Sequence, residues 1–192
     1  FNAPLDQPDH PEKAVRCALA LDTCCQAFAL NRRLEGIAFG QTRIGVNTGP
    51  AVIGNFGGNT RFDYTAYGDA INTTARLESA NKQFGTRICV AAATKDQCPT
   101  LAFRPIGNVV LKGKTTPIML YESITAAEAS REKTAEYQAA YTLLDGGEDK
   151  TLAARQAFER LSGQYPGDGL IAFHAERLRR GASGSLIVLA EK

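Results

Sequence analysis

The sequence lacks the features that would direct a protein into a membrane or onto a nucleic acid. Among its 192 residues there is no run approaching the ~18 apolar residues of a membrane-spanning helix, and no signal peptide is visible. Basic and acidic residues nearly balance, so the formal net charge of +2 does not indicate a nucleic-acid or anionic-membrane partner. We therefore expect a cytoplasmic protein, whose parent would reach a membrane only through segments outside this sequence.

Tryptophan is absent, and methionine occurs once, at Met119. Because the sequence does not open on a start methionine, we interpret it as a fragment or a processed piece of a longer protein. Its hydrophobic content of 44% is ordinary for a soluble globular protein. The length fits one domain, or one domain with an appendage.

Cysteine is present in a pattern that does not indicate disulfides or a metal site. The number of cysteines is odd, and no C-x-x-C pair occurs. Two of them lie seven residues apart, on one face of an expected helix. We therefore expect buried free thiols in a reducing compartment. The cysteines are Cys17, Cys24, Cys25, Cys89 and Cys98, of which Cys17 and Cys24 share the helix face.

The best-marked element is a strand followed by a helix between residues 62 and 84. Asp69 stands where an N-cap is expected, and Gly85 stands where a C-cap would end the helix. Between them, mostly apolar residues recur at helical spacing and predict a buried face. That face comprises Ala70, Ile71, Thr74, Leu77, Asn81 and Phe84.

Asn72 and Arg76 lie one helical turn apart and point away from this face. An amide next to a fixed cation could hold a sugar and a phosphate. Taken alone, the same pair is also typical of an ordinary solvent-exposed helix surface.

The segments around this element predict further helices and strands. An N-terminal helix begins after Asp9, an expected N-cap, and ends at Gly36. Its apolar stripe includes Val15, Ala18, Leu21 or Asp22, Cys25 and Phe28. Strands over 39–47 and 51–56, joined by a short turn, predict an antiparallel hairpin, with a tight turn over 57–59 after it. Beyond the central helix we expect strands over 87–91, 103–112 and 118–124 and a short helix over 92–98.

From residue 125 the pattern changes to helices, expected over 126–144, 152–164 and 170–180, with a short docked strand over 186–189. Part of the second helix matches the back half of a tetratricopeptide-like repeat, at Ala154, Phe158, Leu161 and Pro166. A single such unit cannot bury its apolar face alone, so we expect the tail to pack on the rest of the chain or on a partner. We place His174 on a solvated basic helix end.

Three sequence blocks, taken together, resemble the catalytic domain of class III nucleotidyl cyclases. They are Arg43–Pro50 (RIGVNTGP), Asp63–Glu78 (DYTAYGDAINTTARLE) and Leu111–Lys114 (LKGK), in the order of that family. The resemblance covers about residues 1–124, the latter part of such a domain, and leaves 125–192 as a helical tail. It implies an α/β, ferredoxin-like cyclase fold without its first strands, and a parent enzyme that converts ATP to 3',5'-cyclic AMP and pyrophosphate.

The resemblance also implies roles for individual residues. Asn72 would orient the ribose, and Arg76 would stabilise the α-phosphate in the transition state. Lys112 would hold the terminal phosphates, with Lys114 a weaker candidate. Thr65 occupies the position that reads the purine edge, where a hydroxyl is similar to the adenylate-specific pattern, so ATP is the expected substrate.

Members of the family use two Mg²⁺ or Mn²⁺ ions held by two aspartates, both expected upstream of residue 1 here. We therefore expect no metal ligands in this chain, and no activity from it alone. The family's sites form between two subunits, which implies a homodimer. Without its first strands, the sheet would keep unpaired edges, so we expect the chain to persist by dimerising, exchanging elements or retaining an upstream piece.

A second interpretation is a degenerate cyclase-like module that binds nucleotide, or a partner through its tail, without catalysis. The complete set of Thr65, Asn72, Arg76 and Lys112 favours the enzyme, because a non-catalytic module has no physical need of all four. Metal-binding aspartates in the upstream sequence would decide between the two.

Overall fold

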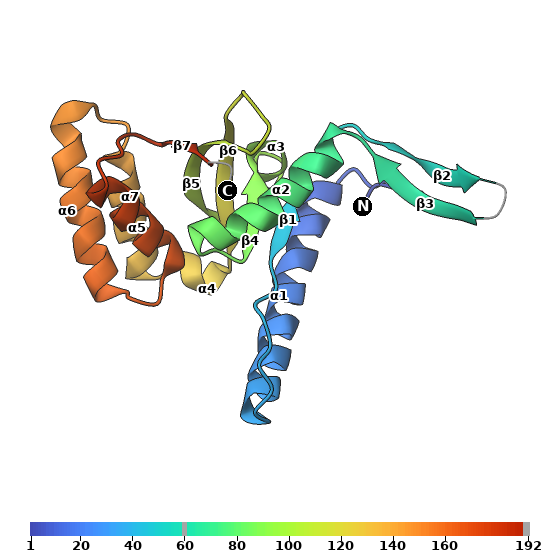
Figure 1. The fold of residues 1–192 in the computed structure, drawn as a ribbon, viewed down its shortest axis with the longest axis horizontal. Helices are drawn as coiled ribbons and strands as arrows, with labels where there is room; N and C mark the ends of the chain where they lie inside the picture. Colours follow the sequence, from blue (N-terminus) through green and yellow to red (C-terminus); the bar gives the residue numbers. More distant parts are fainter. Residues whose placement is uncertain (59–60, 190–192) are drawn as a thin grey trace.

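The computed structural model describes residues 1–58 and 61–189 and confirms the expected mixture of α and β structure. A five-stranded sheet forms the centre, a two-stranded hairpin extends to one side of it, and helices gather at the other side (Figure 1). The helices are α1 (His10–Leu34), α2 (Asp69–Phe84), α3 (Ala92–Lys95), α4 (Ala126–Ala129), α5 (Glu132–Thr142), α6 (Glu148–Gln164) and α7 (Gly169–Arg179). The strands are β1 (Ile44–Val46), β2 (Val52–Gly58), β3 (Arg61–Tyr67), β4 (Ile88–Ala91), β5 (Ala102–Val110), β6 (Ile118–Ile124) and β7 (Leu186–Val188).

The central sheet is mixed, with the strand order β1-β4-β6-β5-β7. β1 runs parallel to β4, β6 is antiparallel to both β4 and β5, and β7 runs parallel to β5. Every residue of β4 is buried, as is typical of a short apolar run covered on both faces. The strands predicted after the central helix are confirmed, and so is the docked strand at the end of the chain.

The predicted hairpin between residues 39–47 and 51–56 is wrong. β1 pairs with its neighbour β4 in the central sheet. β2 pairs with β3, with Val52 opposite Tyr67. β3 follows β2 directly in the sequence, so pairing these two strands requires only a short connection. β1 pairs with β4, which the chain reaches only after α2 has crossed back over the sheet. The tight turn predicted over 57–59 falls partly outside the described residues, at Asn59.

α2 has the predicted limits and lies directly on the sheet. A Cβ added at Gly45 of β1 would lie 2.4 Å from the carbonyl oxygen of Thr74, so only glycine allows this close approach. Asn81 donates from Nδ2 to the carbonyl oxygen of Ile44 at 3.0 Å. Gly85 adopts the left-handed C-cap conformation that was predicted, with φ of 69°.

Two expectations for α2 are wrong. Leu77, Asn81 and Phe84 are buried as expected, but Ile71 is 42% exposed, because the first turn of the helix extends beyond the edge of the sheet. Asp69 makes no capping hydrogen bond, since Gly68 holds the N-cap position. The Asp69 carboxylate pairs instead with Lys114.

α1 begins and ends near the predicted residues, but only its first half packs on the sheet (Figure 1). Val15 and Ala18 are buried with Val46. Of the alternatives Leu21 and Asp22, Asp22 is buried and Leu21 is 50% exposed, and the expected core residue Phe28 is also 50% exposed. Asp9 stands at the N-cap position without a capping hydrogen bond, since its carboxylate pairs with the side chain of Lys13, four residues further on, at 2.8 Å.

The expectation of buried thiols is wrong for Cys17 and Cys24, which are exposed. Cys89 and Cys98 are buried, and Cys25 is half-buried. All five cysteines are free thiols, as predicted.

The tail packs on the rest of the chain, as predicted. One hydrophobic cluster runs without interruption from α2 through the sheet into α5, α6 and α7. The expected single helix over 126–144 is divided into α4 and α5, because Arg131 is extended (φ −76°, ψ 144°). The likeness of this tail to a tetratricopeptide unit, and a domain boundary at residue 125, stay predictions.

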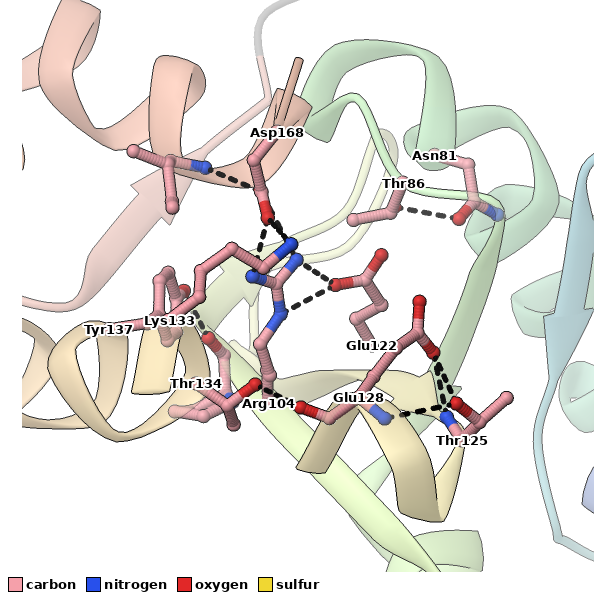
Figure 2. A network of polar contacts seen from close by, with 12 residues as sticks. Asn81, Thr86, Arg104, Glu122, Thr125, Glu128, Lys133, Thr134, Tyr137 and Asp168 are labelled. Carbon is pink, nitrogen blue, oxygen red and sulfur yellow. Dashed lines mark hydrogen bonds and ion pairs between the residues drawn. The ribbon is translucent and has the colours of Figure 1, made fainter. Parts of the chain in front are cut away.

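A buried group of charges joins the tail to the sheet (Figure 2). Arg104 of β5 donates to Glu122 of β6 at 2.5 and 2.9 Å, and to Asp168 at 2.8 and 3.1 Å. Lys133 of α5 also pairs with Asp168 at 2.8 Å. Burial alone would raise the pKa of Asp168, but the hydrogen bonds and charge of Arg104 lower it to about 2. Asp168 is therefore ionised, and it caps α7 by accepting from the backbone N–H of Ile171.

The expectation that His174 lies on a solvated helix end is wrong, because His174 is completely buried. Its ring stacks on Phe158 with centroids 4.8 Å apart, and Tyr137, Tyr141 and Phe173 surround it. Arg177 donates to Nδ1 at 3.1 Å. Burial, together with the charge of Arg177, holds the pKa of His174 well below its usual value, so the ring is neutral. His174 lies on the inner face of α7. The basic residues Arg179 and Arg180 are exposed and form ion pairs with Glu176.

Replacing Asp168 tests how far the fold depends on the buried charges. We expect Asp168→Asn to lower the free energy of unfolding by about 3 kcal/mol, because Arg104 and Lys133 lose a buried counter-charge. Chemical denaturation followed by circular dichroism measures the change. The exposed carboxylate of Glu176 is the control, and Glu176→Gln should leave the unfolding midpoint unchanged. Equal midpoints for Asp168→Asn and the wild type would contradict the prediction.

His174 should make stability fall in mild acid. Histidine in the unfolded chain takes up a proton near pH 6.5, whereas the buried ring of His174 stays neutral. The free energy of unfolding should therefore decrease below pH 6.5, by up to ~1.4 kcal/mol per pH unit. His174→Gln should remove this decrease between pH 6.5 and 5. The raised pKa of Glu122 acts in the opposite direction, but it is common to both proteins and cancels in their difference. Parallel curves for the two proteins would refute the prediction.

Candidate functional site

The loop between β5 and β6 lies against α2. A Cβ added at Gly113 would lie 3.5 Å from Nη2 of Arg76, which places the Arg76 guanidinium beside the Lys112-Gly113-Lys114 turn. The turn is closed by a hydrogen bond from the backbone N–H of Lys114 to the carbonyl oxygen of Leu111, at 2.9 Å. Arg76 is half-buried and Lys112 is exposed.

Asn72 is exposed on the same side of α2 as Arg76, one turn nearer the start of the helix. The structure therefore brings together Asn72, Arg76 and the Lys112–Lys114 turn, from two blocks of sequence far apart in the chain. An amide, a guanidinium and two ammonium groups thus form a cationic surface that could receive a polyphosphate and an attached sugar.

Asp69 belongs to the same surface, although the sequence interpretation made it a helix cap. Its carboxylate pairs with Lys114, and the hydrogen bond from Lys114 is the main reason that the pKa of Asp69 is lowered. Asp69, Asn72 and Arg76 are spaced i, i+3 and i+7, so they share one helix face. That spacing was the signal in the sequence that could have identified Asp69 as part of the same surface as Asn72 and Arg76.

Thr65 lies apart from these residues. It stands on β3 opposite Gly54 and lines a groove of about 920 Å³ between the hairpin, α1 and the first turns of α2. Ile71 and Thr74 line the same groove, whereas Asn72, Arg76 and Lys112 do not. The groove around Thr65 and the surface formed by Asn72, Arg76 and Lys112 therefore use different residues of α2.

Within residues 1–58 and 61–189, no group of three or more His, Cys, Asp or Glu side chains could hold a metal ion. The expectation that the metal ligands lie upstream of residue 1 stays a prediction. In the same residues, no helix is long and apolar enough to cross a membrane.

Comparison with known proteins gives one consistent result. The model of the "Adenylate and Guanylate cyclase catalytic domain" family matches residues 2–123. Adenylate cyclase 1 of Rhizobium meliloti (strain 1021) is 39% identical over 130 residues, which are 67% of this chain and 20% of that protein. This chain thus spans about a fifth of that relative's length.

Solved structures of the family have the same fold. The adenylyl cyclase CyaB from P. aeruginosa superposes with a TM-score of 0.59 at 28% identity, covering 69% of this chain and 66% of that one. The guanylate cyclase domain of RhGC from Catenaria anguillulae, solved in complex with GTP, superposes with a TM-score of 0.52 at 26% identity, covering 65% and 64%. Because the family model covers well over half of the sequence, this chain belongs to the adenylate and guanylate cyclase catalytic domain family.

Proposed function

We propose that this chain is the part of an adenylate cyclase that binds the ribose and phosphates of ATP. The parent enzyme would convert ATP to 3',5'-cyclic AMP and pyrophosphate, as a phosphorus–oxygen lyase. The position of the Arg76 guanidinium beside the Lys112–Lys114 turn, one helical turn from Asn72, is the observation that carries this proposal.

The chemistry fits the charges on this surface. The ribose 3'-hydroxyl loses its proton to solvent and its oxygen forms a bond to the α-phosphorus, the bond from that phosphorus to the β-phosphate oxygen breaks, and pyrophosphate leaves with the negative charge. Arg76 would stabilise the charge that develops on the α-phosphate, and Lys112 would hold the terminal phosphates. Asn72 would orient the ribose, so that the attacking oxygen and the leaving group are in line.

ATP, rather than GTP, is proposed on the basis of Thr65. Its hydroxyl can exchange hydrogen bonds with a purine edge, and it lies exposed in the groove beside α2. The similarity to an adenylate cyclase at 39% identity supports this choice. The five free cysteines are consistent with a reducing compartment, and we place the reaction in the cytoplasm.

The active form is proposed to be a homodimer. An isolated two-stranded hairpin is marginally stable in water, yet the hairpin of β2 and β3 exposes large apolar side chains on both strands. They include Val52, Ile53, Phe62, Tyr64 and Tyr67, all at least 42% exposed. A partner subunit would cover these side chains, and each subunit would complete the other's site. Two Mg²⁺ or Mn²⁺ ions would be held by carboxylates outside the described residues.

Arg76 is tested by turnover. In a chain extended upstream through the rest of the domain, with Mn²⁺ present, we expect ATP to yield cyclic AMP and Arg76→Ala to lower kcat by about a hundredfold or more. Arg155 on α6 is an exposed, ion-paired arginine, and Arg155→Ala should have no effect. A correctly folded dimer that converts neither ATP nor GTP would contradict the proposal and favour a non-catalytic regulatory module.

Thr65 is tested by nucleotide preference. Thr65→Val keeps the shape of the side chain and removes the hydroxyl, so kcat/KM for ATP should fall by about tenfold, the value of one hydrogen bond. kcat/KM for GTP should change much less, and the ratio of the two is the measured quantity. An unchanged ratio would show that Thr65 does not read the base.

A further inference from the structure

Asp69 and Lys114 make an ion pair within the cationic surface. Asp69 is the first residue of α2, and its side chain is 74% exposed, whereas that of Lys114 is only 24% exposed. Most of the Lys114 side chain is thus covered by neighbouring atoms, and its ammonium group is held at the start of the helix by Asp69. The pair joins two segments 45 residues apart in the sequence.

This pair lies next to Arg76. A Cβ added at Gly113, which precedes Lys114, would lie 3.5 Å from the Arg76 guanidinium, and Asp69 shares a helix face with Arg76. The charge of Arg76, in addition to the hydrogen bond from Lys114, keeps the pKa of Asp69 below its usual value. At neutral pH, a full negative charge is therefore placed among the cations that the proposed function assigns to phosphate.

A carboxylate at this position works against polyphosphate binding, because like charges several ångströms apart repel. Its presence has a physical explanation if Lys114 exchanges partners. Because the Asp69 side of the ion pair is 74% exposed, water can replace Lys114 as its partner, so Lys114 can leave Asp69 at little cost when a phosphate arrives. The backbone N–H groups at the start of α2 still favour the Asp69 carboxylate after Lys114 has left.

We propose that Asp69 is a built-in counter-anion of the phosphate site. It holds Lys114 in place when no nucleotide is bound, and the terminal phosphates displace it from Lys114 on binding. Asp69 thus positions Lys114. It also weakens the binding of the pyrophosphate product and so assists its release. This inference rests on the proposed function, because it takes the Arg76 and Lys112–Lys114 surface to be the phosphate site.

Binding of inorganic pyrophosphate to the 192-residue chain tests the inference, by titration calorimetry at low ionic strength. Asp69→Asn keeps the size of the side chain and removes its charge, so pyrophosphate should bind about three- to tenfold more tightly. Asp69→Glu retains the charge and should bind like the wild type. In a double-mutant cycle, Lys114→Ala should weaken binding and greatly reduce the effect of Asp69→Asn.

The matched control is Asp96→Asn, which removes the charge of another exposed aspartate paired with a lysine, directly after α3. It should leave the affinity unchanged and so exclude an effect of net charge alone. Unchanged or weaker binding by Asp69→Asn would overturn the inference. If Arg76→Ala abolishes pyrophosphate binding while Asp69→Asn leaves it unchanged, only this inference fails. If the wild type and Asp69→Asn both fail to bind pyrophosphate, the phosphate site itself is refuted, and the inference with it.

Discussion

The buried charges around Arg104 are the interaction on which the arrangement of the molecule depends. Arg104 of the sheet satisfies its donors on Glu122 and Asp168, and its guanidinium lies 4.9 Å from the ring centroid of Tyr137. A guanidinium this deeply buried is tolerated only when all its partners are present. Since Asp168 also caps α7, the same carboxylate fixes the tail on the sheet and starts the helix that carries His174 (Figure 2).

The tail in turn holds the end of α2. Gly85 and Gly169 meet backbone to backbone, since a Cβ added at Gly85 would lie 2.6 Å from the Cα of Gly169. Phe84 packs edge-on against Phe173 with centroids 5.2 Å apart. With its final turn held by α7 and its middle against β1, α2 presents its first turns as a fixed edge. The candidate site is built on that edge, which is why its residues can be exposed and still well placed.

The opposite side of the molecule is less completely packed. The hairpin and the second half of α1 both extend from the sheet with apolar side chains exposed, among them Phe28, Leu34 and Phe62 (Figure 1). Large apolar side chains with this exposure are typical of surfaces that another subunit or segment covers. The proposed homodimer would use this side, while the tail keeps the other side closed.

The sequence by itself determined the local features. The limits of α2, the left-handed Gly85 and the strands β5, β6 and β7 follow from caps and from hydrophobic periodicity, which act over a few residues. Family motifs were enough to name Asn72, Arg76 and Lys112 as candidates. Only the tertiary structure decided the rest, because strand partners and burial depend on segments distant in the sequence. It paired β1 with β4, buried His174, left Cys17 exposed, and turned Asp69 from an expected cap into the partner of Lys114.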